Sequence, residues 1–87
     1  MKNYRIYAEV EHRLELVNGN VKNENVVLIL DQLILVEEVP VVIVIEHDFD
    51  LDMDTPVYVY SNNQDEYIKT RNNIGGYKYG NSKDCTL

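Results

Sequence analysis

The chain has 87 residues, of which 45% are hydrophobic, and a formal net charge of −7 at pH 7. This length fits one domain and leaves no room for a second, and the hydrophobic content is that of a globular protein, not a disordered one. The single cysteine, Cys85, excludes an intramolecular disulfide and a multi-cysteine metal site, so a reducing, cytoplasmic setting is expected. The apolar runs are too short for a signal peptide or a membrane span, and no membrane contact is expected.

The N-terminal residues predict a β-hairpin. Between Tyr4 and Leu16, apolar side chains occupy most even positions and charged ones most odd positions, which indicates a long strand with one buried face. Asn18-Gly19 then matches the favoured pair of a type I′ turn. In that register Glu15 faces Lys22, an opposite-charge pair that stabilises two adjacent strands. We therefore expect a hairpin that turns at Asn18-Gly19.

Residues 25 to 38 allow two interpretations, because their apolar side chains follow neither period cleanly. Two short strands around Asp31-Gln32 are favoured, since runs of Val, Ile and Leu suit a sheet covered on both faces. A buried helix that ends before Pro40 is the alternative. From Val41 the alternation resumes and runs into the acidic stretch, Thr55-Pro56 ends or bends that strand, and residues 57–60 form another.

A helix is predicted near the C-terminus. Ser61-Asn62-Asn63-Gln64 matches a capping box, in which Ser61 accepts from the amide of Gln64. Acids follow in the first turns and bases in the last, as the helix dipole favours, and Gly75-Gly76 ends the helix. Tyr77 to Tyr79 then add an edge strand.

Together these elements predict an α+β fold: a mainly antiparallel sheet, made from the N-terminal hairpin and further short strands, with one C-terminal helix. Residues 1–80 are expected to form a single compact domain and residues 81–87 a frayed tail. Tyr58 with Tyr60, and Tyr77 with Tyr79, are same-face pairs that belong either to the core or to a partner contact. The core is favoured for at least one of the two pairs.

Neither an enzyme nor a metal site is expected. His47 shares the parity of the core residue Ile45, which indicates an ordinary sheet histidine, and no activated nucleophile or glycine-rich phosphate loop lies near it. The alternate aspartates from Asp48 to Asp54 suggest a calcium loop, but the EF-hand glycine at the sixth position and glutamate at the twelfth are missing. No cofactor is expected either.

The acidic stretch is the most distinctive feature of the sequence. An acid occupies every second position from Glu46 to Asp54, so an extended strand would place five carboxylates on one face, with Phe49, Leu51 and Met53 on the other. Charge is also unevenly distributed along the chain. Residues 23 to 68 contain eleven acids and no lysine or arginine, while all eight bases lie towards the two ends. Such a one-sided cluster loses stability through repulsion, attracts basic partners and argues against direct binding of nucleic acid.

This small, acidic chain with its row of carboxylates resembles the phage-encoded DNA-mimic inhibitors, whose carboxylates stand where DNA phosphates would lie. The resemblance implies that the protein acts in the host cytoplasm and occupies the basic DNA-binding groove of a host protein, with a histone-like nucleoid protein such as HU favoured as the target. A strand presents a carboxylate about every 6.7 Å against a phosphate about every 3.4 Å, so one row is insufficient. Other acids, or a second copy in a homodimer, must supply the rest. The expected contact residues are Glu46, Asp48, Asp50, Asp52, Asp54, Glu37, Glu38, Asp31, Asp65 and Glu66.

A protein-interaction or assembly module without DNA mimicry is the alternative, such as an immunity or antitoxin-like partner or a phage structural subunit. It would bind through the tyrosine pairs and an exposed sheet edge, with mostly apolar contacts.

Overall fold

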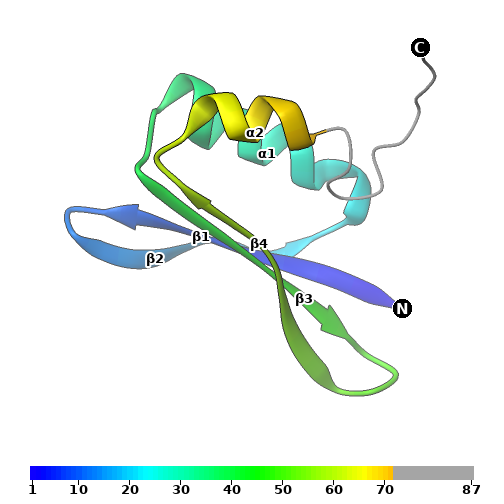
Figure 1. Cartoon of the computed structure of the whole chain (residues 1–87). Helices are drawn as coiled ribbons and strands as arrows, with labels where there is room; N and C mark the ends of the chain where they lie inside the picture. The colour runs from blue at the N-terminus through cyan, green and yellow to red at the C-terminus, as the bar shows by residue number, and fades with distance from the viewer. Residues whose placement is uncertain (72–87) are drawn as a thin grey trace, which may run out of the picture.

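The computed structural model describes residues 1–71. In these residues a four-stranded antiparallel sheet has the strand order β2-β1-β3-β4, and helical segments follow β2 and β4 (Figure 1). The elements are β1 (Lys2–Val10), β2 (Arg13–Val21), a 3-10 turn (Asn23–Asn25), α1 (Val26–Asp31), a π-helical extension of α1 (Gln32–Val36), β3 (Val41–Asp48), β4 (Met53–Ser61) and α2 (Gln64–Thr70). The predicted α+β class is confirmed, although the described residues contain a second helix that the sequence interpretation did not favour.

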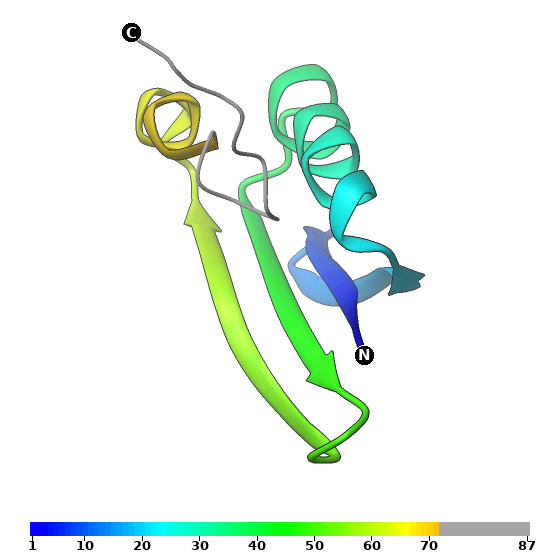
Figure 2. The same cartoon turned by 90° about the vertical axis from the view of Figure 1, so that its right-hand side faces the viewer.

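Both helices lie on the same side of the sheet, so the described residues form two layers. Figure 1 shows α1 and α2 above the strands, and the turned view in Figure 2 shows them as neighbouring coils over one face. The core lies between the layers because side chains alternate along each strand. Its sheet side is formed by Tyr4, Ile6, Ala8, Val21, Val42, Val44 and Tyr60, and its helix side by Val26, Leu30, Leu33, Ile34 and Tyr67.

The predicted turn at Asn18-Gly19 is wrong. The chain reverses at Glu11 and His12, which have φ angles of 52° and 69°, and Asn18-Gly19 lies inside β2 next to irregularities in the β1–β2 register. This hairpin places Val21 opposite Tyr4, where both are buried. A turn at Asn18-Gly19 would instead extend the second strand through Val26 and Val27, whose side chains are needed in the core on the helical side.

The predicted strands around Asp31-Gln32 are also wrong, and the helical alternative is correct. The buried positions Val26, Val27, Leu30, Leu33 and Ile34 recur every three or four residues and form one helical face, while Leu28 and Val36 remain exposed. Burial of this face on the sheet outweighs the weak preference of Val and Ile for strands. The helical segment ends at Val36, and Glu38, whose φ is 57°, then turns the chain before Val39-Pro40.

The predicted C-terminal helix is present as α2, but its cap is two residues later than expected. Ser61 is the last residue of β4, and the Asn63 side chain accepts the hydrogen bond from the Glu66 amide at 3.1 Å. Gln64 does not return to the cap; its side-chain amide donates to the carbonyl of Ile34 at 2.8 Å and so ties α2 to the first helical segment. The expected helix end at Gly75-Gly76, the edge strand at Tyr77 to Tyr79 and the tail lie outside the described residues.

Tyr58 and Tyr60 belong to the core, as favoured for at least one tyrosine pair. Tyr60 is buried, and Tyr58 packs against the buried cluster. The ring centroid of the fully buried Tyr67 lies 6.2 Å from that of Tyr60 and 6.3 Å from that of Tyr58. The hydroxyl of Tyr67 donates to Asp31 at 2.5 Å.

In residues 1–71, no helix has the length and apolar character needed to cross a bilayer.

Candidate functional site: the acidic hairpin and the open sheet face

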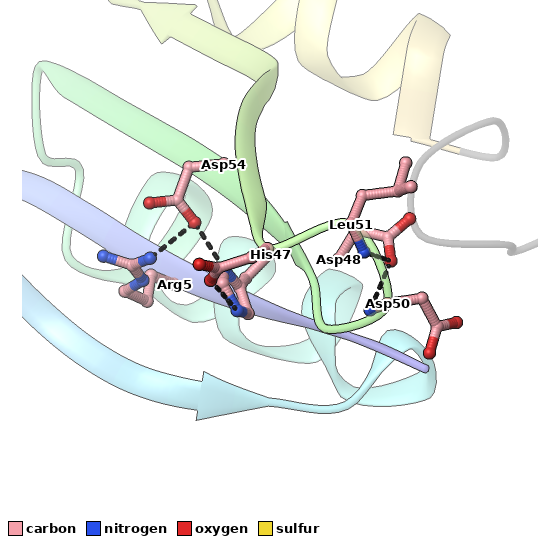
Figure 3. A network of polar contacts seen from close by, with 7 residues as sticks. Arg5, His47, Asp48, Asp50, Leu51 and Asp54 are labelled. Atoms are coloured by element: carbon pink, nitrogen blue, oxygen red, sulfur yellow. Dashed lines mark hydrogen bonds and ion pairs between the residues drawn. The ribbon is translucent and has the colours of Figure 1, made fainter.

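The acidic stretch forms the tip of a hairpin, so the predicted straight ribbon from Glu46 to Asp54 is wrong. β3 ends at Asp48, residues 49–52 form a turn, and β4 begins at Met53. The cause is local: one carboxylate oxygen of Asp48 accepts hydrogen bonds from the backbone N–H groups of Asp50 at 2.9 Å and Leu51 at 3.2 Å (Figure 3). Aspartate favours such turns because its short side chain can bond to the backbone two residues ahead.

Asp48 therefore has a structural role at the tip. Partial desolvation pushes its pKa up, but the N–H donors of Leu51 and Asp50 outweigh this effect and the pKa of Asp48 lies below its ordinary value. The turn is completed by Asp52, whose φ of 52° is in the left-handed region that aspartate tolerates.

The carboxylates of the predicted row point in different directions. Glu46 lies on the helix side of the sheet, where it accepts from the Tyr4 hydroxyl at 3.0 Å and lies 3.7 Å from the Lys2 amine. Asp50 pairs with the amine of Met1 at 2.9 Å, although its side chain is 80% exposed. Asp52 is the most solvent-accessible of the five, with 94% of its side chain exposed.

Asp54 is part of a polar cluster on the opposite face of the sheet. Its Oδ1 lies 2.6 Å from Arg5 Nη2 and 2.7 Å from His47 Nδ1, across two strand pairs (Figure 3). These bonds from His47 and Arg5 favour the carboxylate and hold the pKa of Asp54 below its ordinary value. Phe49 packs edge-on against the His47 ring, with centroids 4.5 Å apart. Within this cluster Arg5 and Asp54 form a salt bridge, and the His47 ring shares a hydrogen bond with the same carboxylate oxygen.

The remaining predicted acids lie near the other end of β3. Glu38 and Asp65 line one polar hollow together with residues 62–64, and Glu37 accepts a hydrogen bond from Gln32 at 3.3 Å. Glu66 lines a second hollow beside Tyr58. The eight residues of β3 separate this end from the hairpin tip by about 26 Å, so the ten acids do not form one continuous surface.

Asp31 makes contacts within the chain, because its two carboxylate oxygens accept hydrogen bonds from Tyr67 and Arg71. The Arg71 guanidinium donates to Asp31 at 2.8 Å and the Tyr67 hydroxyl donates to the other oxygen.

Among residues 1–71, no group of histidine, cysteine or acidic side chains has the arrangement of a metal site.

The surface that the sequence interpretation missed is the face of the sheet turned away from the helices. One apolar row crosses all four strands: Tyr7 pairs with Leu16 on one side and with Ile43 on the other, and Ile43 pairs with Val59. Leu16 and Val59 are 53% and 59% exposed. We call this surface the open-face patch; it comprises Tyr7, Leu14, Leu16, Ile43, Ile45, Val57 and Val59.

No helix or loop of the described part of the chain covers the open-face patch (Figures 1 and 2). Residues Val41 to Ile45 did contain a signal for it, because they are apolar at both parities and such a strand has apolar side chains on both faces. The helices cover only one of those faces.

The open-face patch also carries little net charge, in contrast to the chain as a whole. The charged side chains that share its parity on the central strands are Arg5 and Glu9, and Arg5 is paired with Asp54 of β4. Most of the acidic excess lies instead at the hairpin tip and beside the helices.

Residues 1–71 form a two-layer α+β fold with one apolar sheet face that none of their helices or loops covers. No protein-family model, curated protein or solved structure matches the chain.

Proposed function

We propose that the protein is a small interaction or assembly module that binds another protein through the open-face patch. The observation that carries this proposal is the apolar row from Leu16 to Val59, which crosses the whole sheet and is exposed at both ends. Contiguous apolar surface of this kind on a soluble domain marks an interaction site, because exposure to water is unfavourable. The low charge of the patch supports the same function, since the centres of protein interfaces are depleted of charged residues.

A second candidate is the acidic inhibitor that occupies the basic DNA-binding groove of a host protein. The observation that favours it is the absence of lysine and arginine from residues 23 to 68, which contain eleven acids. Its contact would be centred on the hairpin tip, where Asp50 and Asp52 are exposed, and not on a straight row of five carboxylates.

The two candidates are separated by capture experiments with matched variants. The tagged full chain is incubated with bacterial lysate, and the captured proteins are compared for wild type, Val59→Lys on the open face, and Asp52→Asn at the tip. Val36→Lys is the control, because Val36 is 67% exposed on the helical side and receives the same substitution.

For the interaction module we expect Val59→Lys to abolish capture, while Asp52→Asn, Val36→Lys and an excess of duplex DNA leave it unchanged. Release of the captured protein by duplex DNA and by salt, together with weaker capture by Asp52→Asn, would instead support the acidic inhibitor. Capture that survives every variant would rule out both surfaces.

A further inference from the structure

The open-face patch is a surface that a second copy of the chain can cover. We propose that two copies pack face to face through it and form a symmetric dimer. This inference rests on the proposed function, because it names the partner of the same surface.

The first argument is area. Four strands about 4.8 Å apart and eight or nine residues long, at about 3.3 Å per residue, give a face of roughly 19 by 30 Å. Two such faces cover about 1,100 Å² before the relief of the side chains is counted, which reaches the minimum of roughly 1,000 Å² for a specific interface. The apolar row extends from one edge strand to the other, and the Arg5–Asp54 pair lies beside it on the same face.

The second argument is charge. Two chains of net charge −7 repel each other, but the acids responsible lie mostly at the hairpin tip and near the helices. On the open face Asp54 is already neutralised by Arg5 at 2.6 Å, and Glu9 is the one further carboxylate on the central strands with the parity of the patch. A basic partner would find few unpaired carboxylates here, whereas a second copy offers an equally apolar and nearly uncharged face.

The third argument is shape. Sheets pack face to face when their mean strand directions lie within about 30° of each other and their side chains interdigitate about 10 Å apart. Two copies have the same twist, and a two-fold axis presents identical apolar rows to each other. Tyr7 and Ile43 lie on the two central strands, at the centre of the row, and in the dimer they would become buried in both copies.

The test measures the mass of the full chain in solution by light scattering after size-exclusion chromatography, and its dissociation constant by sedimentation equilibrium. Wild type should have twice the 10.2 kDa of one chain. Val59→Lys and Leu16→Lys each place a charge on the face but at opposite edges of the sheet, on β4 and β2. Both should weaken the dimer by about tenfold or more, since each buries unpaired charges in the contact. Val36→Lys should not, and circular dichroism shows whether each variant is folded.

Three results would overturn the dimer. The first is a monomeric wild type, and the second is a dimer that neither Val59→Lys nor Leu16→Lys weakens. The third is loss of the dimer in only one of these two variants, because that result indicates an edge-to-edge contact. If wild type is monomeric but Val59→Lys still abolishes capture of a different protein, the proposed function stands without the dimer. If both measurements fail, the open-face patch is not a binding surface.

Discussion

Asp31 joins the two helices through a single carboxylate. It accepts from the hydroxyl of Tyr67 and from the guanidinium of Arg71, both contributed by the α2 region. Burial of Tyr67, and then its hydrogen bond to Asp31, raise the pKa of the phenol well above its ordinary value. Tyr67 therefore stays protonated across the physiological range and acts as a hydrogen-bond donor in the core.

Removing this hydroxyl should destabilise the protein. Tyr67→Phe keeps the packing but leaves one oxygen of Asp31 without its donor, so we expect a loss of about 1 to 2 kcal/mol in the free energy of unfolding, measured by urea denaturation. Tyr60→Phe is the control, because Tyr60 is equally buried and its hydroxyl makes no hydrogen bond within the described residues. Equal losses in the two variants would show that the Asp31 bond contributes nothing.

Asp54 should make stability depend on pH. Because its folded pKa lies below its unfolded pKa, the stability that it contributes is present above about pH 4 and is lost as the pH falls through the folded pKa. We expect Asp54→Asn to have a lower Tm than wild type at neutral pH, with the difference closing below about pH 4. Glu24→Gln, an exposed acid on the 3-10 turn, is the control and should follow wild type throughout. A constant difference at all pH values would contradict this role for the carboxylate.

At this scale the sequence predicted residue types but not partners. The parity of His47 placed it on a strand but on the core face with Ile45, whereas both residues lie on the open face. Its partner Asp54 became apparent only when the hairpin brought the two together across the turn. Likewise nothing in the local pattern linked Asp31 to Tyr67, which is 36 residues away.

Among the elements, the β1–β2 turn shows most clearly how a local signal was overridden. Asn18-Gly19 is a favourable turn pair, but the turn occurs at Glu11 and His12, which both have positive φ. The strain of two non-glycine residues there is smaller than the gain from pairing two nine-residue strands and freeing residues 26–34 for the helical core face.

Relieving that strain should stabilise the hairpin. Glu11→Asn combined with His12→Gly provides residues that tolerate positive φ, and we expect a gain of about 1 kcal/mol in urea denaturation. Gly19→Ala is the companion variant: the added methyl group would lie 3.3 Å from the flexible end of Leu16, so stability should change by less than about 0.5 kcal/mol. A large loss from Gly19→Ala, with no gain at the other site, would contradict the observed turn.

The α1 segment was ambiguous in sequence for a physical reason. Val, Ile and Leu fit strands and buried helices alike, and only the position of the sheet decides which side of the segment is covered. The exposed Leu28 and Val36 fall outside the buried helical face, which tertiary packing selects. By contrast α2 was predictable, because charge placement along it is a local signal.

For the whole molecule, the fold class followed from the alternation along the strands and the charge placement along α2, while the candidate site did not. The acids were treated as one surface because they are neighbours in sequence, but the hairpin divides them between two ends of β3. The open-face patch was missed because Leu14 and Leu16 shared the apolar parity of Tyr4 and Ile6, and were assigned to the core; the turn at Glu11 and His12 moves them to the opposite face.

The central position of β3 has a further consequence. Its first five residues, Val41 to Ile45, are all β-branched and uncharged, the composition that most readily stacks into amyloid fibrils. In the native sheet β1 and β4 occupy both of its hydrogen-bonding edges, so this segment cannot recruit another molecule. Detachment of β4 on heating would uncover it, and irreversible aggregation would then compete with refolding.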